Sequence, residues 1–201
     1  HYTTCGLSEC LQRAADRIGW REKKGKLPPM SGIGIAAMVH PSGSVLYAEG
    51  NFSNVSVELQ PDGRVLVCTQ TADAGTGQNT LLAQFVAQTL AIAVERVSVL
   101  HMDTERSPDD LGSAASRVTF VTGQAAIDAA RKFVQVVCER IAADLGRAVD
   151  EVRYALGRFQ APSLAPQGIG WDDVAERFGT LRAEGHSSID LPRPDAKTGY
   201  G

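Results

Sequence analysis

The chain has 201 residues, enough for one domain or two small ones with a hydrophobic core. Its 20 basic and 23 acidic residues give a formal net charge of -3, so there is no basic excess and we expect no nucleic-acid partner. No apolar run approaches the roughly 20 residues that span a bilayer, and no N-terminal signal pattern is present, so we expect a soluble protein with no membrane partner.

The four cysteines and four histidines are scattered along the chain without the spacing of a metal or iron–sulfur site. Such cysteines indicate free thiols in a reducing, cytoplasmic environment. The chain begins with His1 rather than Met and ends in a loop-like stretch, residues 198–201. We therefore expect both ends to lie within a longer polypeptide.

Residues 1–29 are predicted to form a short N-terminal helix and a basic linker. Ser8 can cap the helix, and Leu11 and Ile18 lie on its apolar face. The lysine-rich stretch that follows, before two prolines, indicates an exposed connection. Residues 30–201 are predicted to form the main α/β unit.

The beginning of this unit is predicted to be rich in strands. Residues 32–39 (GIGIAAMV) contain a G-x-G-x-x-A string, but they lack the strand before it and the helix after it that a dinucleotide-binding turn needs, so we predict a buried strand. Residues 44–48 can form a second strand. Residues 55–59 and 65–67 alternate between apolar and polar around a Pro-Asp-Gly turn, which predicts a β-hairpin.

Two segments of the chain are candidates for ligand binding. The first segment, residues 73–80 (DAGTGQNT), lies between a predicted strand and a predicted helix over residues 81–90. Backbone N–H groups at a helix start are unpaired and carry partial positive charge, so they favour a phosphate or another anion. The segment lacks the G-K-[ST] ending of a nucleotide-hydrolysing loop, and a diphosphate or the edge of a pterin fits it better. On spacing alone, a structural turn remains an equal alternative.

The second segment, residues 112–117 (GSAASR), has the same character and also precedes a predicted helix. Arg117 can make a paired contact with a phosphate, or it can face solvent beside a helix N-cap. Two such segments suggest one ligand held from two sides. The acidic residues of the preceding loop, Asp103, Asp109 and Asp110, are expected to be solvated.

The remaining pattern completes an α+β fold with helices packed on a mixed sheet. Residues 97–100 are predicted as a strand, and residues 121–145 as a long helix that Gly146 stops. The tail is predicted to contain a strand, a short helix and a last strand at residues 154–159, 171–178 and 181–189, respectively.

Two stretches carry a family resemblance, namely TADAGTGQNT at residues 71–80 and GSAASRVTFVTGQAA at residues 112–126. With residues 32–39, the hairpin and the Asp103-Thr104 pair, they resemble the molybdopterin-binding large subunit of the xanthine oxidase and aldehyde oxidase family of molybdenum hydroxylases. The amino-acid sequence of the second stretch is most similar to that of the 4-hydroxybenzoyl-CoA reductase alpha subunit. The resemblance covers most of residues 5–145.

The resemblance implies that this chain forms part of a molybdopterin-binding domain in a molybdenum-dependent oxidoreductase. A glutamine often stands in the family where this chain has Thr76, and Ser113 and Thr119 are secondary candidates for contact. The cofactor-binding residues that the resemblance implies are Ala74, Gly75, Thr76, Gly77, Ala115, Ser116, Arg117 and Val118.

The resemblance also implies the remaining parts of the enzyme. The cofactor would be molybdopterin with molybdenum, in the cytosine dinucleotide form, and iron–sulfur clusters and FAD would reside on partner subunits or domains. The family's catalytic glutamate lies outside the matched region, so we expect the isolated chain to be inactive. The alternative is a non-catalytic assembly domain whose glycine-rich loops are structural turns.

Overall fold

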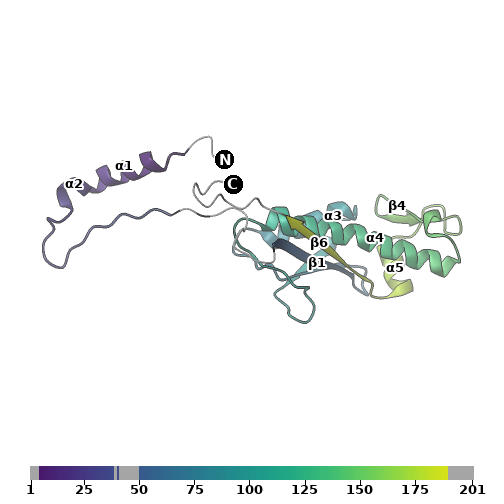
Figure 1. Ribbon diagram of the computed structural model, residues 1–201. Helices are drawn as coiled ribbons and strands as arrows, with labels where there is room; N and C mark the ends of the chain where they lie inside the picture. Colours follow the sequence, from purple (N-terminus) through teal and green to yellow (C-terminus); the bar gives the residue numbers. More distant parts are fainter. Residues whose placement is uncertain (1–4, 39, 41–49, 190–201) are drawn as a thin grey trace. The chain divides into compact units, whose positions relative to one another are not determined.

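The computed structural model describes residues 5–38, 40 and 50–189. By its internal contacts the chain divides into two units, residues 1–41 with 192–201, and residues 42–191 (Figure 1). None of the helices in the described ranges is both long and apolar enough to span a membrane.

The first unit contains the helices α1 (Leu7–Ile18) and α2 (Trp20–Lys23). α1 begins after Gly6, so Ser8 lies within the helix, and the prediction that Ser8 caps it was wrong. Gly19 ends α1 with a φ of 67°, a left-handed conformation that glycine adopts without strain.

The predicted strand at residues 32–39 is not present over its described part. Residues 32–38 form no regular secondary structure, because a strand needs a hydrogen-bonded neighbour and none pairs with them among the residues that the structure describes. The predicted strand at residues 44–48 lies outside the described residues.

The second unit is built on a four-stranded mixed sheet of β1 (Asn51–Leu59), β2 (Val65–Thr69), β3 (Val97–His101) and β6 (Arg182–Ile189). The strand order is β3-β2-β1-β6. β1 pairs with β2 and with β6 in the antiparallel sense, whereas β2 and β3 are parallel. The predicted hairpin is confirmed as β1–β2, and the mixed sheet is as predicted.

Two helices, α3 (Gln78–Thr89) and α4 (Gly123–Leu145), contact the sheet and each other, and α4 runs along β1 and β6 (Figure 1). α4 ends at Gly146, as predicted, and a π-helical turn, Val118–Thr122, precedes it. Most of the fully buried side chains between helices and sheet are apolar, and they include Val55, Val57, Leu59, Val67, Leu82, Val86, Phe133 and Ile141.

The middle of α4 packs against a small aromatic cluster through Phe133. Trp171 stacks on Phe133 with ring centroids 5.3 Å apart, and it donates a hydrogen bond from Nε1 to the Tyr154 hydroxyl at 3.1 Å. Desolvation raises the pKa of Tyr154 to about 12. The remaining elements here are two 3-10 turns (Val94–Arg96 and Val149–Glu151), the two-stranded sheet of β4 (Arg153–Ala155) and β5 (Arg158–Gln160), and α5 (Trp171–Phe178).

α4 crosses β6 without a side chain between the two backbones. A Cβ atom at Gly185 would collide with the amide nitrogen of Ala129 and with the carbonyl oxygen of Ala125. Both alanines are fully buried, so the helix presents its smallest side chains at this crossing. The position of α4 on the sheet therefore depends on the missing side chain at Gly185.

We expect Gly185→Ala to lower the free energy of unfolding by about 3 kcal/mol, because rigid backbone atoms must move to admit the methyl group. Urea unfolding followed by circular dichroism measures this loss. Ser188→Ala, an exposed change on the same strand, serves as the control and should shift stability by less than about 0.5 kcal/mol. Equal stability of the two variants would show that α4 is not held close to β6.

Candidate functional site

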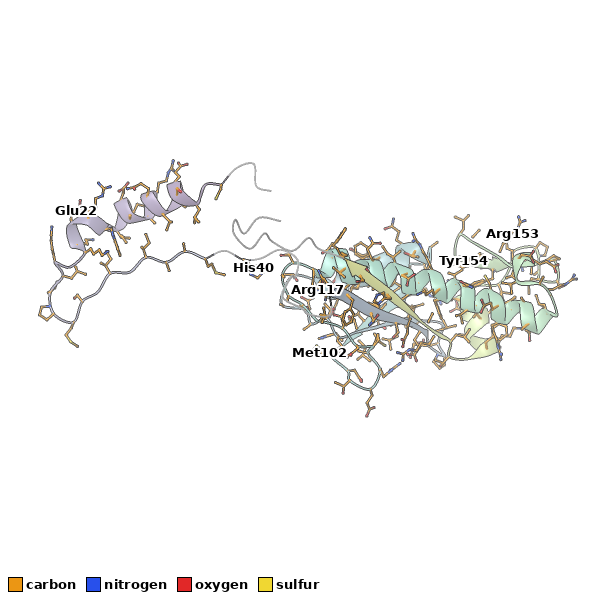
Figure 2. All side chains as sticks on the ribbon, in the orientation of Figure 1. Glu22, His40, Met102, Arg117, Arg153 and Tyr154 are labelled. Carbon is orange, nitrogen blue, oxygen red and sulfur yellow. The ribbon has the colours of Figure 1, made fainter. Side chains whose placement is uncertain are left out.

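The two candidate segments, residues 73–80 and 112–117, follow the two parallel strands. The first segment comes shortly after β2, which ends at Thr69, and the loop to the second segment starts after β3, which ends at His101. The Met102 N–H donates to the Thr69 carbonyl at 3.0 Å, and this hydrogen bond links the chain just after β3 to the end of β2. Parallel neighbours have their carboxyl ends at one edge of the sheet, where open α/β sheets bind ligands. Figure 2 shows Arg117 at one end of the sheet and Tyr154 towards the other.

Asp73 organises the first segment from within. Its Oδ1 atom accepts the backbone N–H groups of Gly75 at 2.9 Å and Gly77 at 3.1 Å, and its Oδ2 atom accepts that of Asn79 at 3.4 Å. The prediction that the N–H groups of this loop point outward unpaired was therefore wrong for these three residues. The carboxylate of the chain itself occupies the place of an external anion.

The same contacts set the pKa of Asp73. Desolvation alone would raise this pKa, but the backbone N–H groups of Asn79, Gly75, Gly77 and Thr76 together outweigh it and lower the pKa below its usual value. The side chain therefore stays ionised under mildly acidic conditions and keeps its N–H partners.

The outer face of the first segment is open. Ala74, Gly75, Thr76 and Gly77 are all exposed. Gly75 and Gly77 have φ values of 92° and 75°, and a Cβ atom at either position would meet no other atom within 4 Å. The glycines are thus required by backbone conformation, and the space beside them is free for a ligand to approach the backbone.

Arg117 is buried, with 1% of its surface exposed, and all five of its side-chain N–H groups have partners. Both predictions for this side chain, a phosphate contact or a solvent-facing arginine, were therefore wrong. The acceptors are Asn51 Oδ1 at 2.8 Å, Asp110 Oδ1 at 3.2 Å, the Gly112 carbonyl at 2.7 Å, Ser53 Oγ at 3.0 Å and the Phe52 carbonyl.

Asp110 is the charged partner of Arg117 in this buried pair. Its side chain has no exposed surface, and its carboxylate also accepts the N–H groups of Gly112 at 2.6 Å and Asn54 at 3.2 Å. The prediction that Asp110 is solvated was therefore wrong. Asp109 is exposed, and Asp103 accepts the backbone N–H groups of the turn that follows it.

The exposed part of the second segment has an unusual backbone. Ala115 and Ser116 both have positive φ values, 47° and 56°, which residues with a side chain seldom adopt. Ser116 is exposed, Ala115 is half-buried, and Val118 is buried at the start of the π-helical turn. Arg117 and Asp110 hold this backbone in place, since they bond to both ends of the segment.

Ser113 links the second segment to the first. Its hydroxyl donates to the Ala72 carbonyl at 2.5 Å and lies 2.9 Å from the Gln78 side-chain oxygen. The candidate residues at positions 74–77 and 115–118 are thus brought to one edge of the sheet. That they face one shared groove remains a prediction.

Several supporting residues were not predicted from the sequence. Asp73 had a signal, since an aspartate at the start of a glycine turn commonly bonds the backbone that follows it. The partners of Arg117 on β1 had none, because that strand is distant in the sequence, and Asp110 was expected to be solvated. The supporting residues that were not predicted are Asn51, Ser53, Asn54, Asp73 and Asp110. Within the described residues, no group of three or more His, Cys, Asp or Glu side chains is arranged to hold a metal ion.

Comparison with known proteins identifies relatives of the chain. Residues 11–201 match the family model described as a molybdopterin cofactor-binding domain. The chain is 34% identical over 165 residues to the 6-hydroxypseudooxynicotine dehydrogenase complex subunit gamma of Paenarthrobacter nicotinovorans, covering 80% of this chain and 20% of that protein. It is 24% identical over 208 residues to the carbon monoxide dehydrogenase large chain of Afipia carboxidovorans, covering 94% and 24%, respectively.

Solved structures give the same picture of the fold. A crystal structure of Cu,Mo-CO dehydrogenase in the carbon monoxide reduced state matches with a TM-score of 0.62 and 21% identity, covering 88% of this chain and 26% of that one. Quinoline 2-oxidoreductase from Pseudomonas putida 86 matches with a TM-score of 0.56 and 24% identity, covering 68% and 19%. The chain thus spans 20% and 24% of the length of the two curated relatives.

We expect Arg117→Lys to lower the free energy of unfolding by about 3 kcal/mol, because a lysine has three donors and no planar fork for the buried acceptors. Urea unfolding measures the loss. Arg64→Lys, at an exposed position, should change stability by less than about 0.5 kcal/mol. A stable Arg117→Lys variant would contradict the assignment of this side chain as a buried anchor.

We expect Asp73→Asn to speed hydrogen exchange at the Gly75, Gly77 and Asn79 amides, since the variant lacks the carboxylate that accepts them. In the wild type a lowered folded-state pKa stabilises the loop above the unfolded pKa of about 3.9, and this protection is lost as the pH falls through the folded-state value. Asp62→Asn, which removes a carboxylate bonded to one backbone N–H, is the control. Unchanged exchange in Asp73→Asn would refute the role of the carboxylate.

Proposed function

The chain belongs to the molybdopterin cofactor-binding domain family, and we propose that residues 74–77 and 115–118 form part of its cofactor site. The observation that carries this proposal is the placement of both segments at the carboxyl edge of the parallel pair β2–β3, joined through Ser113. A ligand at this edge meets exposed backbone from both segments. The molybdopterin would provide the redox-active molybdenum when bound.

The chemistry of these residues fits a pterin dinucleotide. Gly75 and Gly77 leave open space beside the backbone, so a flat ring system can approach it closely. Because Asp73 places a carboxylate within the first segment, an uncharged part of the ligand suits this side. Thr76 is exposed there and can offer its hydroxyl.

The second segment suits the charged part of the ligand. Ser116 is exposed and precedes a continuous helical stretch from the π-helical turn into α4, whose first N–H groups carry partial positive charge. The Arg117 side chain takes no part, since its donors are all used internally, and its contribution is confined to the backbone. Phosphate groups of a dinucleotide are the ligand groups that such a site favours.

For the whole protein we propose a xanthine oxidase-type molybdenum oxidoreductase. The relatives are a dehydrogenase complex subunit and a dehydrogenase large chain, so we propose iron–sulfur and flavin partners on other subunits or domains. We further propose the cytosine dinucleotide form of the cofactor, a cytoplasmic location, and a closest relation to 4-hydroxybenzoyl-CoA reductase alpha subunits through residues 112–126. The catalytic glutamate would lie on another part of the polypeptide, and the isolated chain would be inactive.

A non-catalytic assembly domain is the competing function. The observation that favours it is that the charged side chain of each segment, Asp73 or Arg117, forms its hydrogen bonds within the chain rather than with a ligand. In that case the glycine-rich loops would be structural turns only.

Molybdenum and pterin analysis of the intact protein that contains this domain separates the two functions. We expect about one molybdenum per chain, together with a pterin, after growth with molybdate. Thr76→Trp should lower this content severalfold, because an indole at an exposed loop position fills the space beside the two glycines. Thr180→Trp, at an exposed position before the start of β6, is the matched control and should keep the full content.

A wild-type protein without molybdenum or pterin would refute the cofactor site and favour the assembly domain. Full cofactor content in the Thr76→Trp variant would refute the placement of the site at the first segment.

A further inference from the structure

The second segment is a short loop whose two ends are fixed to each other. The Gly112 N–H donates to Asp110 Oδ1 at 2.6 Å, and the Arg117 side chain donates to the Gly112 carbonyl at 2.7 Å. Arg117 also bonds to the Phe52 carbonyl at the beginning of β1. The base of this loop is therefore attached to the sheet, and only residues 113–116 project from it.

The first segment is fixed in a different way. Asp73 accepts N–H groups from Gly75, Gly77 and Asn79, so this loop keeps its shape through a bond network of its own. Each segment is thus internally held. What sets the distance between them is a separate question, because neither Asp73 nor Arg117 reaches the other segment.

Ser113 of the second segment forms hydrogen bonds to both ends of the first segment's glycine loop. Ala72 immediately precedes the loop that Asp73 organises, and Gln78 begins α3 immediately after it. The Ser113 hydroxyl lies 2.5 Å from the Ala72 carbonyl oxygen and 2.9 Å from the Gln78 side-chain oxygen, so one atom contacts both ends of the glycine loop. Within the part of the chain that the structure describes, the hydrogen bonds between residues 72–78 and 112–117 all involve Ser113.

The chemistry of a hydroxyl suits this place. A serine hydroxyl has one hydrogen to donate and two lone pairs to accept with. The hydrogen goes to the Ala72 carbonyl, which can only accept. The Ser113 hydroxyl then has no hydrogen left for Gln78. The Gln78 amide nitrogen can donate to the Ser113 oxygen if the amide group is turned by half a rotation, since the oxygen and nitrogen of an amide are assigned from their hydrogen bonds.

We propose that Ser113 is a positioning residue that sets the spacing between the two cofactor-binding segments. This inference rests on the proposed function, since it presumes that residues 74–77 and 115–118 hold one ligand. Ser113 does not contact the ligand, because its hydroxyl is engaged within the protein. Loss of the hydroxyl leaves each segment formed but lets their separation vary, and a ligand held by both is then released faster.

The test is cofactor retention by the intact protein that contains this domain. Wild type, Ser113→Ala, Ser113→Thr and a control are incubated in dilute buffer, and the remaining pterin is measured by fluorescence after oxidation, with molybdenum measured in parallel. We expect Ser113→Ala to lose cofactor about fivefold faster than wild type, the ratio that corresponds to one lost hydrogen bond. Ser113→Thr keeps the hydroxyl and should restore retention.

Thr89→Val provides the matched control. Thr89 donates its hydroxyl to the Phe85 carbonyl at 2.7 Å near the other end of α3, so this variant removes the same type of bond away from the two segments. We expect its cofactor retention to equal that of wild type. A general loss of stability would instead accelerate release in both Thr89→Val and Ser113→Ala, and that result would overturn the positioning role.

The remaining outcomes also decide the matter. Equal retention in Ser113→Ala and wild type, with both fully loaded, overturns the role of Ser113 while the proposed function stands. A wild-type protein without pterin overturns the proposed function and this inference with it. If Ser113→Ala does not fold, Ser113→Cys, whose thiol is a weak donor of similar size, takes its place in the same comparison.

Discussion

The site depends on the buried guanidinium group of Arg117, whose five N–H groups all donate hydrogen bonds. Arg117 connects the second segment to the first residues of β1, and Asp110 supplies the opposite charge. Neither ion is exposed at its side chain, so each would be costly to bury without the other. Removal of this pair would release both ends of the segment at once, and the positive φ values at Ala115 and Ser116 would have nothing to maintain them.

The two segments use opposite charges in the same manner. In the first, a carboxylate gathers backbone N–H groups, and in the second, a guanidinium gathers carbonyl and side-chain oxygens. Arg117 is buried beneath the second segment, whereas Asp73 is partly exposed within the first, and small residues form the outer face of both. The second segment therefore offers a ligand backbone, methyl groups and hydroxyls rather than a formal charge.

Much of the main unit follows from local patterns. The β1–β2 hairpin, α3, and the end of α4 at Gly146 were predicted because alternation, helical periodicity and a glycine stop are properties of neighbouring residues. The order of strand, segment and helix also predicted that two segments of similar chemistry belong together. The location of Arg117 could not be predicted, since its partners on β1 lie 64 to 66 residues earlier, and no local rule distinguishes a buried arginine from an exposed one. The strand expected at residues 32–39 failed for a related reason, because strand formation is decided by a neighbour that the segment itself does not contain.

The long sequence separation between Arg117 and β1 also has a consequence for folding kinetics. Closing a loop of 64 to 66 residues carries an entropy penalty that local turns avoid, so contacts of this range form after the hairpin and the helices. The second segment, which needs Asn51, Phe52 and Ser53 in place, would become ordered after the hairpin and the helices, and the pairing of β6 with β1 closes a still longer loop. A nascent chain would therefore carry the β1–β2 hairpin and the helices before it carries a competent second segment, and cofactor insertion would have to wait for that later step.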